Sequence, residues 1–300
     1  MAIPARHFCR PNSSVENSSW RIGHSEWLQT ITCYANRMIR RFASMIGRRV
    51  NSLCWRLMEP AIHLDSGIRL AIQSRSDWDV FAEIFVNQEY DLAIGDTLRA
   101  SDGASTILVV DLGANVGFFS NRVAHLAKLM NLRSHVLTVL AFEGNPKTFE
   151  TLTRNVSPHL NCAIKAHLGL IGRRTGSSHI YSTPYTGANS VVSEQDKRSS
   201  LSWRGAFAVP SAYIDLSQHI PAGSRIDLLK CDIEGSEEEF LRNYPEILQC
   251  TDRLVIEFHP RHVDTDACHK LILRAGLIHL KTLRQQDTMS LSYFIRSTRT

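Results

Sequence analysis

The pattern of apolar and polar positions divides the chain at about residue 60. Beyond that point, continuous apolar runs alternate with segments in which apolar residues recur every three or four positions. The runs at 106–110, 136–142 and 226–231 predict strands buried on both faces, and two further strands are predicted at 163–170 and 253–257. The periodic segments predict helices at about 118–130, 146–156, 236–243 and 265–275. Repeated strand–helix units predict an α/β fold with a doubly wound, Rossmann-like and mostly parallel sheet.

Shorter elements are expected before and after this sheet. The stretch 172–203 is rich in Ser, Thr and Gly, which is typical of loops with short strands. The remaining pattern predicts a hairpin of 62–64 with 68–72, a helix over 77–90 that Ser76 or Asp77 would cap, and two final strands near 278–282 and 291–296.

Residues 1–60 form a separate basic extension, and residues 61–300 are expected to form one domain. The first part of the extension is polar without periodicity, which predicts partial disorder. From Trp27 to Leu53, apolar residues share one face of a long helix. Three interpretations stay open for residues 27–58. They could pack on the body or on a second copy of the chain, lie on an anionic membrane surface, or belong to an organellar transit peptide.

Composition narrows the class of protein. With 43% hydrophobic and 21% charged residues over 300 positions, the chain is globular, and it has no run of about 18 apolar residues that would predict a spanning helix. The first 26 residues lack the apolar stretch of a secretory signal. Seven Cys without CxxC spacing argue against a disulfide framework or a structural zinc site. We therefore expect a cytoplasmic protein that is at most peripheral at a membrane surface.

The net charge of +5 is unevenly shared. Residues 1–60 hold nine Arg, no Lys and three acidic residues, so they carry +6 and the rest of the chain carries −1. A nearly neutral body lacks the basic surface that binds nucleic acid along its length. Nucleic acid is therefore not an expected partner.

The turn after the strand 106–110 carries the clearest chemical signal. Asp111, Gly113, Asn115 and Gly117 form a D-x-G-x-N-x-G sequence at a strand-to-helix junction. Gly113 permits a sharp turn, Gly117 lets the helix begin close to the strand, and the helix N-terminus offers free N–H groups to a ligand. At the tip of the next strand, the carboxylate of Glu143 can accept hydrogen bonds from both hydroxyls of a ribose. The pattern therefore predicts a nucleotide-type cofactor site.

The same turn distinguishes between cofactors. A dinucleotide site usually has G-x-G-x-x-G, whereas here Asn115 replaces the second Gly and Phe118 the third. An NAD-dependent oxidoreductase is therefore the less favoured alternative. Asp111 would suit a ligand with an amino or cationic group, and S-adenosylmethionine carries both an ammonium and a sulfonium. That methyl donor is the favoured cofactor, with Asn145 beside Glu143 completing the expected site.

Six motifs follow one another in the order seen in FkbM-type methyltransferases: VVDLGANVGFFS, AFEGNP, YTGANSVV, VPSAYIDL, DLLKCDIEGSE and VIEFHP. From about Asp77 to Pro260 the chain resembles that family, with Gly144 as a departure from its pattern. The resemblance implies a class I methyltransferase fold, whose seven-stranded sheet has an antiparallel last strand. It also implies O-methylation of a hydroxyl group on a small molecule, sugar or glycan. Residues 187–190 are then expected in an acceptor-binding lid, where a sugar could stack on Tyr181, Tyr185 or Trp203.

Polar residues crowd two further strand ends. Asp232 and Glu234 follow the strand 226–231, and Glu257 and His259 stand at the end of the strand 253–257. An alcohol needs a base or a metal ion to lose its proton, and His259 is the first candidate base, with Asp232 second. Alternatively, these four residues could together hold Mg²⁺, which would bind the acceptor hydroxyl. Glu237, nearby, is expected to cap the following helix.

A protein of another class also fits this sequence. A catalytically silent, methyltransferase-like domain could bind a partner through residues 27–58. Replacing Asp232 or His259 without effect on any activity would support that alternative. Methylation of nucleic acid is disfavoured because the body is neutral.

Overall fold

A computed structural model describes most of the chain beyond the basic extension. The described residues are 60–100, 106–132, 137–156, 162–182, 189–190, 207–286 and 288–297. The predicted helix between Trp27 and Leu53 lies outside them, so the division at residue 60 and the roles considered for 27–58 stay predictions.

The centre of the described part is a seven-stranded sheet in the order β11-β12-β10-β9-β3-β4-β5. The five strands from β10 to β5 run parallel, and β12 is antiparallel to both of its neighbours. This is the predicted doubly wound sheet with an antiparallel C-terminal pair. Its strands are β3 (Ile107–Leu112), β4 (Leu137–Glu143), β5 (Ala163–Leu168), β9 (Leu228–Cys231), β10 (Arg253–Phe258), β11 (Leu277–Gln285) and β12 (Ser290–Arg296).

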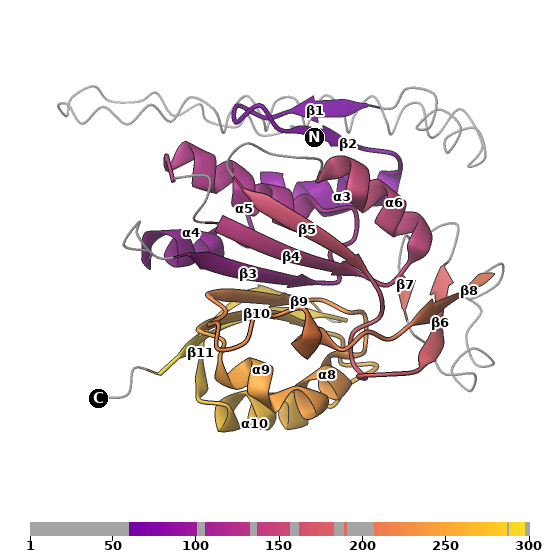
Figure 1. Cartoon of the computed structure of the whole chain (residues 1–300), viewed down its shortest axis with the longest axis vertical. Coiled ribbons are helices and arrows are strands. Elements are labelled where there is room, and N and C mark those ends of the chain that lie inside the picture. Colours follow the sequence, from indigo (N-terminus) through magenta and orange to yellow (C-terminus); the bar gives the residue numbers. More distant parts are fainter. Residues whose placement is uncertain are drawn as a thin grey trace, which may run out of the picture. The chain divides into compact units, whose positions relative to one another are not determined.

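Helices cover both faces of this sheet, as Figure 1 shows. The helices α3, α5 and α6 lie over one face and α8, α9 and α10 over the other. A hairpin of β1 (Ala61–His63) and β2 (Arg69–Ala71) confirms the one expected around Gly67. The helices are α3 (Arg75–Phe81), α4 (Asp91–Ala100), α5 (Phe118–Leu129), α6 (Pro146–Asn155), α8 (Glu237–Asn243), α9 (Pro245–Gln249) and α10 (Thr265–Arg274).

The helix predicted over 77–90 is wrong in its cap and in its length. The cap is Ser74, whose hydroxyl accepts a hydrogen bond from the Asp77 amide, while the Asp77 carboxylate accepts one from the amide of Gln73. This reciprocal pair starts the helix earlier than expected. After Phe81 the chain continues as a π-helical turn, η1 (Ala82–Val86), and Gln88 then adopts a left-handed φ of 56° before α4 begins. Such turns are often found beside functional sites.

The strand β11 contains two irregularities. Its register against β12 shifts between His279 and Lys281 and again between Thr282 and Arg284. Each shift inserts one extra residue, as in a β-bulge, and therefore changes the face on which the following side chain emerges. Arg284 consequently stands opposite Leu291 of β12.

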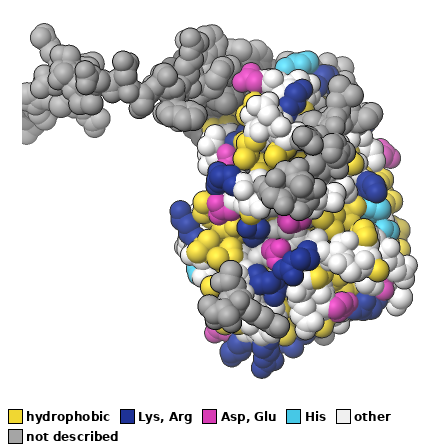
Figure 2. Space-filling view, turned by 60° about the vertical axis from the view of Figure 1, so that its left-hand side comes forward, with side chains coloured by type: hydrophobic (Ala, Val, Ile, Leu, Met, Phe, Trp, Pro, Cys, Tyr) yellow, Lys and Arg dark blue, Asp and Glu magenta, His cyan; other side chains and the backbone are white. Residues whose placement is uncertain are grey.

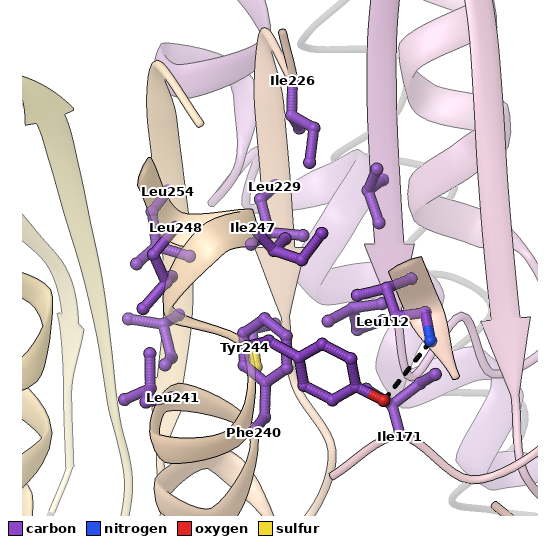
Figure 3. Close-up of a cluster of buried hydrophobic side chains, with 14 of the residues drawn as sticks. Leu112, Ile171, Ile226, Leu229, Phe240, Leu241, Tyr244, Ile247, Leu248 and Leu254 are labelled. Carbon is purple, nitrogen blue, oxygen red and sulfur yellow. Dashed lines mark hydrogen bonds between the residues drawn. The ribbon is translucent and has the colours of Figure 1, made fainter. Parts of the chain in front are cut away.

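The larger hydrophobic cluster lies between the sheet and the helices α8 to α10. Figure 3 shows Leu112, Leu229 and Leu254 of the sheet beside Phe240 and Tyr244 of the helical layer. Tyr244 is fully buried, and its hydroxyl accepts a hydrogen bond from the amide of Leu216. The cluster holds the helical layer against the β9 and β10 strands, whose ends carry the polar residues described below.

A second, three-stranded sheet has the order β7-β6-β8 and follows β5 in the chain. It consists of β6 (Ser177–Ser182), β7 (Asn189–Ser190) and β8 (Phe207–Ala212). The strands β6 and β7 confirm the expectation of short strands within 172–203, whereas β8 lies beyond that range. The small sheet lies at one end of the parallel strands in Figure 1.

The surface agrees with the nearly neutral charge of the body. Figure 2 shows one face on which Lys and Arg side chains are interspersed with Asp and Glu among apolar ones. In the part of the chain that the structure describes, no helix combines the length and apolar character needed to cross a bilayer.

Candidate functional site

The site lies where the order of the parallel strands reverses. From β3 the sheet grows toward β4 and β5 on one side and toward β9 and β10 on the other. The loops that leave β3 and β9 therefore diverge and open a crevice at the carboxyl ends of the strands. A pocket at this position is lined by residues from both sides: Gly113, Asn115, Phe142, Glu143, Gly144, Gly169, Leu170, Ile171, Ile180, Asp232, Ile233, Glu234 and Ser236.

The glycine turn after β3 is required by close backbone approach. Gly113 has φ +73°, and a Cβ at this position would stand 1.7 Å from the carbonyl oxygen of Asp232. Gly117 has φ +87°, and its Cβ would come within 3 Å of Leu152 in α6. Asn115, between them, also has a positive φ, of 50°. The predicted reasons for Gly113 and Gly117, a sharp turn and a close helix start, are therefore both present.

Glu143 is fixed at the tip of β4 by two backbone amides. One carboxylate oxygen accepts a hydrogen bond from the amide of Asn115 at 2.9 Å, and the other accepts from that of Asn145 at 2.8 Å. The Asn145 side chain caps α6, so its side chain supports the turn. Burial raises the pKa of Glu143 to about 7. Each carboxylate oxygen keeps a lone pair for a further donor, such as a ribose hydroxyl.

Asp111 does not face the pocket. Its side chain is fully buried, lies 3.2 Å from the ammonium of Lys230, and accepts a hydrogen bond from the hydroxyl of Ser120. Burial disfavours the charged form of Lys230, but the negative charges of Asp111 and Asp232 outweigh it and hold the pKa of Lys230 above its ordinary value. Lys230 also donates to the carbonyl of Gly113 at 2.8 Å. Asp111 is therefore placed to hold the glycine turn through Lys230, and its expected direct contact with the cofactor stays a prediction.

The polar strand ends of β9 and β10 meet as predicted. The imidazole Nε2 of His259 stands 3.6 Å from Glu257 and 3.4 Å from Glu234. One carboxylate oxygen of Asp232 lies with single ligand atoms of Glu257 and His259 within 4.8 Å of one another. Of these residues, Asp232 and Glu234 also line the pocket, so the cluster touches the same crevice as the glycine turn.

Glu237 has more than the capping role expected for it. Its carboxylate, which is fully buried, accepts hydrogen bonds from the amides of Ile233 and Gly235, in the turn before α8. The same carboxylate lies 3.0 Å from Nδ1 of His259. Glu237 therefore holds both the loop that carries Glu234 and the imidazole ring.

The pKa values of the residues in this cluster are shifted by burial and by their mutual charges. Burial alone lowers the pKa of His259, but the hydrogen bond and charge of Glu237 outweigh it and raise the pKa to about 10. Burial and the negative charge of Asp232 raise the pKa values of both Glu234 and Glu257. In this state His259 is an imidazolium at neutral pH, and it donates hydrogen bonds rather than accepting a proton.

Arg284 is a site residue that the sequence analysis missed. Its guanidinium, with the side chain 10% exposed, lies 2.6 Å from Glu257, 2.9 Å from Glu83 of η1 and 3.0 Å from Glu89. It thus connects β10 and β11 to the segment that precedes α4. No motif marks an Arg so far along the chain, and only the bulge in β11 places it opposite Leu291, which itself stands opposite Glu257.

The predicted cofactor and catalytic residues can be located in the structure, whereas the predicted lid lies largely outside the described residues. The structure brings together the expected cofactor residues Gly113, Asn115 and Glu143 with the expected catalytic residue Asp232 around one pocket. For the lid, Asn189 and Ser190 form β7 and pair with β6. Gly187, Tyr185 and Trp203 lie outside the described residues, as does the side chain of Tyr181, so their contact with an acceptor stays a prediction.

Known proteins share this sequence pattern. A family model described as the Methyltransferase FkbM domain matches residues 111–279. Methyltransferase 1 of Beauveria bassiana (strain ARSEF 2860) is 28% identical over 193 residues, which cover 59% of this chain and 72% of that protein. Methyltransferase sdnD of Sordaria araneosa is 27% identical over 194 residues, 56% of this chain and 68% of its own. Among solved structures, M. jannaschii TYW2 in complex with AdoMet aligns over 80% of this chain and 88% of its own, with 14% identity and a TM-score of 0.37.

Proposed function

The chain belongs to the FkbM methyltransferase family, and on that premise we propose that it methylates a hydroxyl oxygen of a sugar or glycan with S-adenosylmethionine as the donor. Methyl transfer from S-adenosylmethionine follows from the family. The hydroxyl acceptor and its sugar character are the proposed part. The observation that carries the proposal is the position of Asp232, which lines the donor pocket and belongs to the cluster of Glu257 and His259.

The residues of the pocket fit this donor. The space beside Gly113 is closed to any Cβ by the Asp232 carbonyl, so only glycine lets the turn that lines the pocket pack against the loop after β9. Glu143, held by the amides of Asn115 and Asn145, presents a carboxylate that suits the two hydroxyls of the ribose. Leu170, Ile171 and Ile180 supply the apolar part of the lining, against which a planar base can pack. We assign to Asp111 the indirect task of holding the turn through Lys230.

For this reaction the protein needs to align the acceptor hydroxyl with the methyl donor and to remove the proton of that hydroxyl. When bound, S-adenosylmethionine supplies an electrophilic methyl group, so that an oxygen–methyl bond forms as the sulfur–methyl bond breaks and its electron pair stays on sulfur. Asp232 is placed to take the hydroxyl proton, because its side chain is 27% exposed and lines the pocket. His259 and Glu257 lie behind it, 8% and 5% exposed. We therefore give Asp232 the role of base and leave His259 and Glu257 to position and polarise the acceptor.

The Mg²⁺ predicted for the cluster of Asp232, Glu234, Glu257 and His259 belongs to the same proposal. Carboxylate oxygens with one imidazole nitrogen are a donor set that a divalent cation accepts. A cation on the acceptor oxygen would lower the pKa of the hydroxyl and so lighten the task of Asp232.

Other parts of the sequence-based picture stay predictions. Residues 27–58 lie outside the described residues, so packing on the body or on a second copy, contact with a membrane surface and transit targeting all stay predictions. The expected cytoplasmic location rests on the sequence alone.

Calorimetric titration of the purified chain with S-adenosylmethionine, NAD and Glu143→Ala as a control tests the donor. Micromolar binding of the methyl donor, weakened at least tenfold by Glu143→Ala, is the expected result. Transfer of a radiolabelled methyl group to a panel of glycans and small alcohols then tests the acceptor. Asp232→Asn should lower the transfer rate at least a hundredfold, about the size of a lost general base. Donor binding without transfer to any hydroxyl would favour the catalytically silent alternative, and binding of NAD instead would overturn the proposal.

A further inference from the structure

Three side chains, of which Asp232 lines the crevice, bring single ligand atoms close to one another. Asp232 and Glu257 contribute one carboxylate oxygen each and His259 one ring nitrogen, and all three atoms lie within 4.8 Å of one another. On an octahedral ion with bond lengths of about 2.1 Å, neighbouring ligand atoms are about 3.0 Å apart and opposite ones about 4.2 Å. The three atoms therefore need to move by no more than about an ångström to meet on one ion.

His259 is oriented toward this point by a buried carboxylate. Its side chain is 10% exposed, and its Nδ1 lies 3.0 Å from an oxygen of Glu237, whose side chain is fully buried. A carboxylate at Nδ1 fixes the proton there and directs Nε2 at the cluster, the arrangement found behind most metal-binding histidines. Nε2 then stands 3.6 Å from Glu257 and 3.4 Å from Glu234, longer than an ordinary hydrogen bond of about 2.7–3.2 Å. Nε2 is therefore directed at two carboxylates without a short hydrogen bond to either of them.

Glu257 is oriented from its other side. One of its oxygens accepts a charged hydrogen bond from Arg284 at 2.6 Å, and the other is the oxygen that faces His259. Both Arg284 and Glu257 stand in register with Leu291, so the three side chains emerge on the same face of the sheet. Without the bulge before Arg284 the guanidinium would emerge on the opposite face. The fold therefore commits one oxygen of Glu257 to Arg284 and leaves the other for a ligand.

The charges at this point are unbalanced. Arg284 is shared among Glu83, Glu89 and Glu257, and Lys230 lies closer to Asp111, at 3.2 Å, than to Asp232, at 3.7 Å. His259 meanwhile lies within 4 Å of three carboxylates, those of Glu234, Glu237 and Glu257, so the carboxylates around it outnumber the cations that are not shared with other acids. Such a buried excess of negative charge favours binding of a cation.

From this geometry we infer that Asp232, Glu257 and His259 form a binding site for one divalent cation, Mg²⁺ or Mn²⁺, with Glu237 and Arg284 as the residues that position its ligands. The inference narrows the four-residue cluster to three ligands, because Glu234, 3.4 Å from the same Nε2 and 39% exposed, is not among the groups whose atoms converge within 4.8 Å. Three protein ligands leave positions for water and for an acceptor oxygen, as in other sites where a cation works on a substrate. That last role rests on the proposed function, whereas cation binding does not.

A proton on Nε2 is the competing species. The cation must displace it, so binding releases a proton and strengthens as the pH rises. If Nε2 keeps its proton instead, His259 and the surrounding carboxylates form ion pairs among themselves and no cation binds.

Titration of the full-length, EDTA-treated chain with MnCl₂, followed by calorimetry and electron paramagnetic resonance, distinguishes the two. We expect one Mn²⁺ per chain, competition by MgCl₂, and nitrogen modulation of the Mn²⁺ spin echo from the imidazole. Asp232→Asn, which keeps the shape of the side chain, should weaken binding at least tenfold. His259→Gln should remove the nitrogen modulation. Glu150→Gln, which removes an exposed carboxylate of α6, is the matched control and should leave the affinity unchanged.

Donor binding measured on the same samples separates the possible failures. Donor binding without Mn²⁺ binding, or an unchanged Mn²⁺ affinity in Asp232→Asn, would overturn the cation site and leave the proposed function standing. Mn²⁺ binding without donor binding would overturn the proposed function instead. Unchanged thermal unfolding of Asp232→Asn and His259→Gln shows that these variants keep the fold, so a loss of binding reports on the ligands.

Discussion

The carbonyl oxygen of Asp232 occupies the place that a side chain at position 113 would need. A Cβ on Gly113 would stand 1.7 Å from that oxygen, far inside van der Waals contact. The glycine turn of the pocket and the loop that carries Asp232 are therefore packed backbone to backbone. A ligand held by one is held at a fixed distance from the other.

Gly113→Ala should therefore destabilise the fold by more than about 2 kcal/mol, because the left-handed conformation alone costs about 1–2 kcal/mol and the clash adds to it. Urea denaturation measures the change. Gly223→Ala is the matched control, since Gly223 has φ +75° but nothing within 4 Å of a Cβ. An equal loss in the two variants would mean that the approach to Asp232 contributes nothing.

Binding of the methyl donor should depend on the ionisation of Glu143. Burial raises its pKa to about 7. Only the ionised carboxylate accepts from both ribose hydroxyls, so affinity should fall as the pH falls through 7. Between pH 8 and pH 6 the ionised fraction, and with it the affinity, drops about tenfold. Calorimetry across this range checks the prediction, and Glu143→Gln should bind weakly with little dependence on pH. A flat profile for the unaltered chain would contradict it.

The raised pKa of Glu143 should make the stability of the fold decrease as the pH rises, whereas binding of the donor should strengthen. Because the folded-state pKa of Glu143 lies above its ordinary value of 4.5, the folded chain binds this proton more tightly than the unfolded one. The contribution of Glu143 to stability is thus greatest below pH 4.5 and declines as the pH rises toward 7. Urea midpoints measured from pH 5 to pH 8 should fall less in Glu143→Gln than in the unaltered chain. An identical fall in both chains would assign the loss to other groups.

Lys230→Met should lower the free energy of unfolding by about 3–5 kcal/mol, the usual effect of leaving a buried charge without its partner. Lys230 is 4% exposed, and Asp111, which it neutralises, is fully buried. Adding Asp111→Asn to Lys230→Met should restore part of the loss, since no buried carboxylate then lacks a counter-charge. Chemical denaturation of the single and double variants gives both numbers. A double variant no more stable than the single one would show that the ion pair does not set the cost.

Arg284→Gln should lower the free energy of unfolding by a similar amount. It should also increase local opening of the segment around Glu83 and Glu89. The guanidinium is 10% exposed and shared by three carboxylates. Arg242→Gln is the control, because Arg242 forms an exposed pair with Glu238 worth no more than about 0.5 kcal/mol. Hydrogen exchange should increase over residues 82–90 in Arg284→Gln only. Unchanged exchange there would mean that Arg284 does not fasten the segment.

Much of this architecture could be predicted because burial leaves a clear pattern. Strands covered on both faces, such as β3 and β10, read as continuous apolar runs, and the required glycines of the turn are visible as letters. Glu143 could be placed because a strand-end carboxylate follows the glycine turn at a known distance.

The rest depends on features without a sequence period. Ser74, Ser76 and Asp77 are all acceptable helix caps, and only tertiary packing selects Ser74. The bulge that turns Arg284 toward Glu257 does not show in the alternation of β11, where most residues are exposed. Asp111 was expected to meet the cofactor because it ends a strand just before the glycine turn. Its pairing with Lys230 joins two strands far apart in sequence and leaves no local pattern.

The central position of β3 also sets an order of events during synthesis. Its neighbour β4 follows almost at once, whereas its other neighbour, β9, comes much later: the amide of Leu108 bonds to Asp227, 119 residues further along the chain. At about 5–20 residues per second, a nascent chain therefore waits several seconds with one edge of β3 unpaired. Over that interval Gly113 has no Asp232 to pack against, so the glycine turn emerges from the ribosome well before the loop that lines the other side of the pocket.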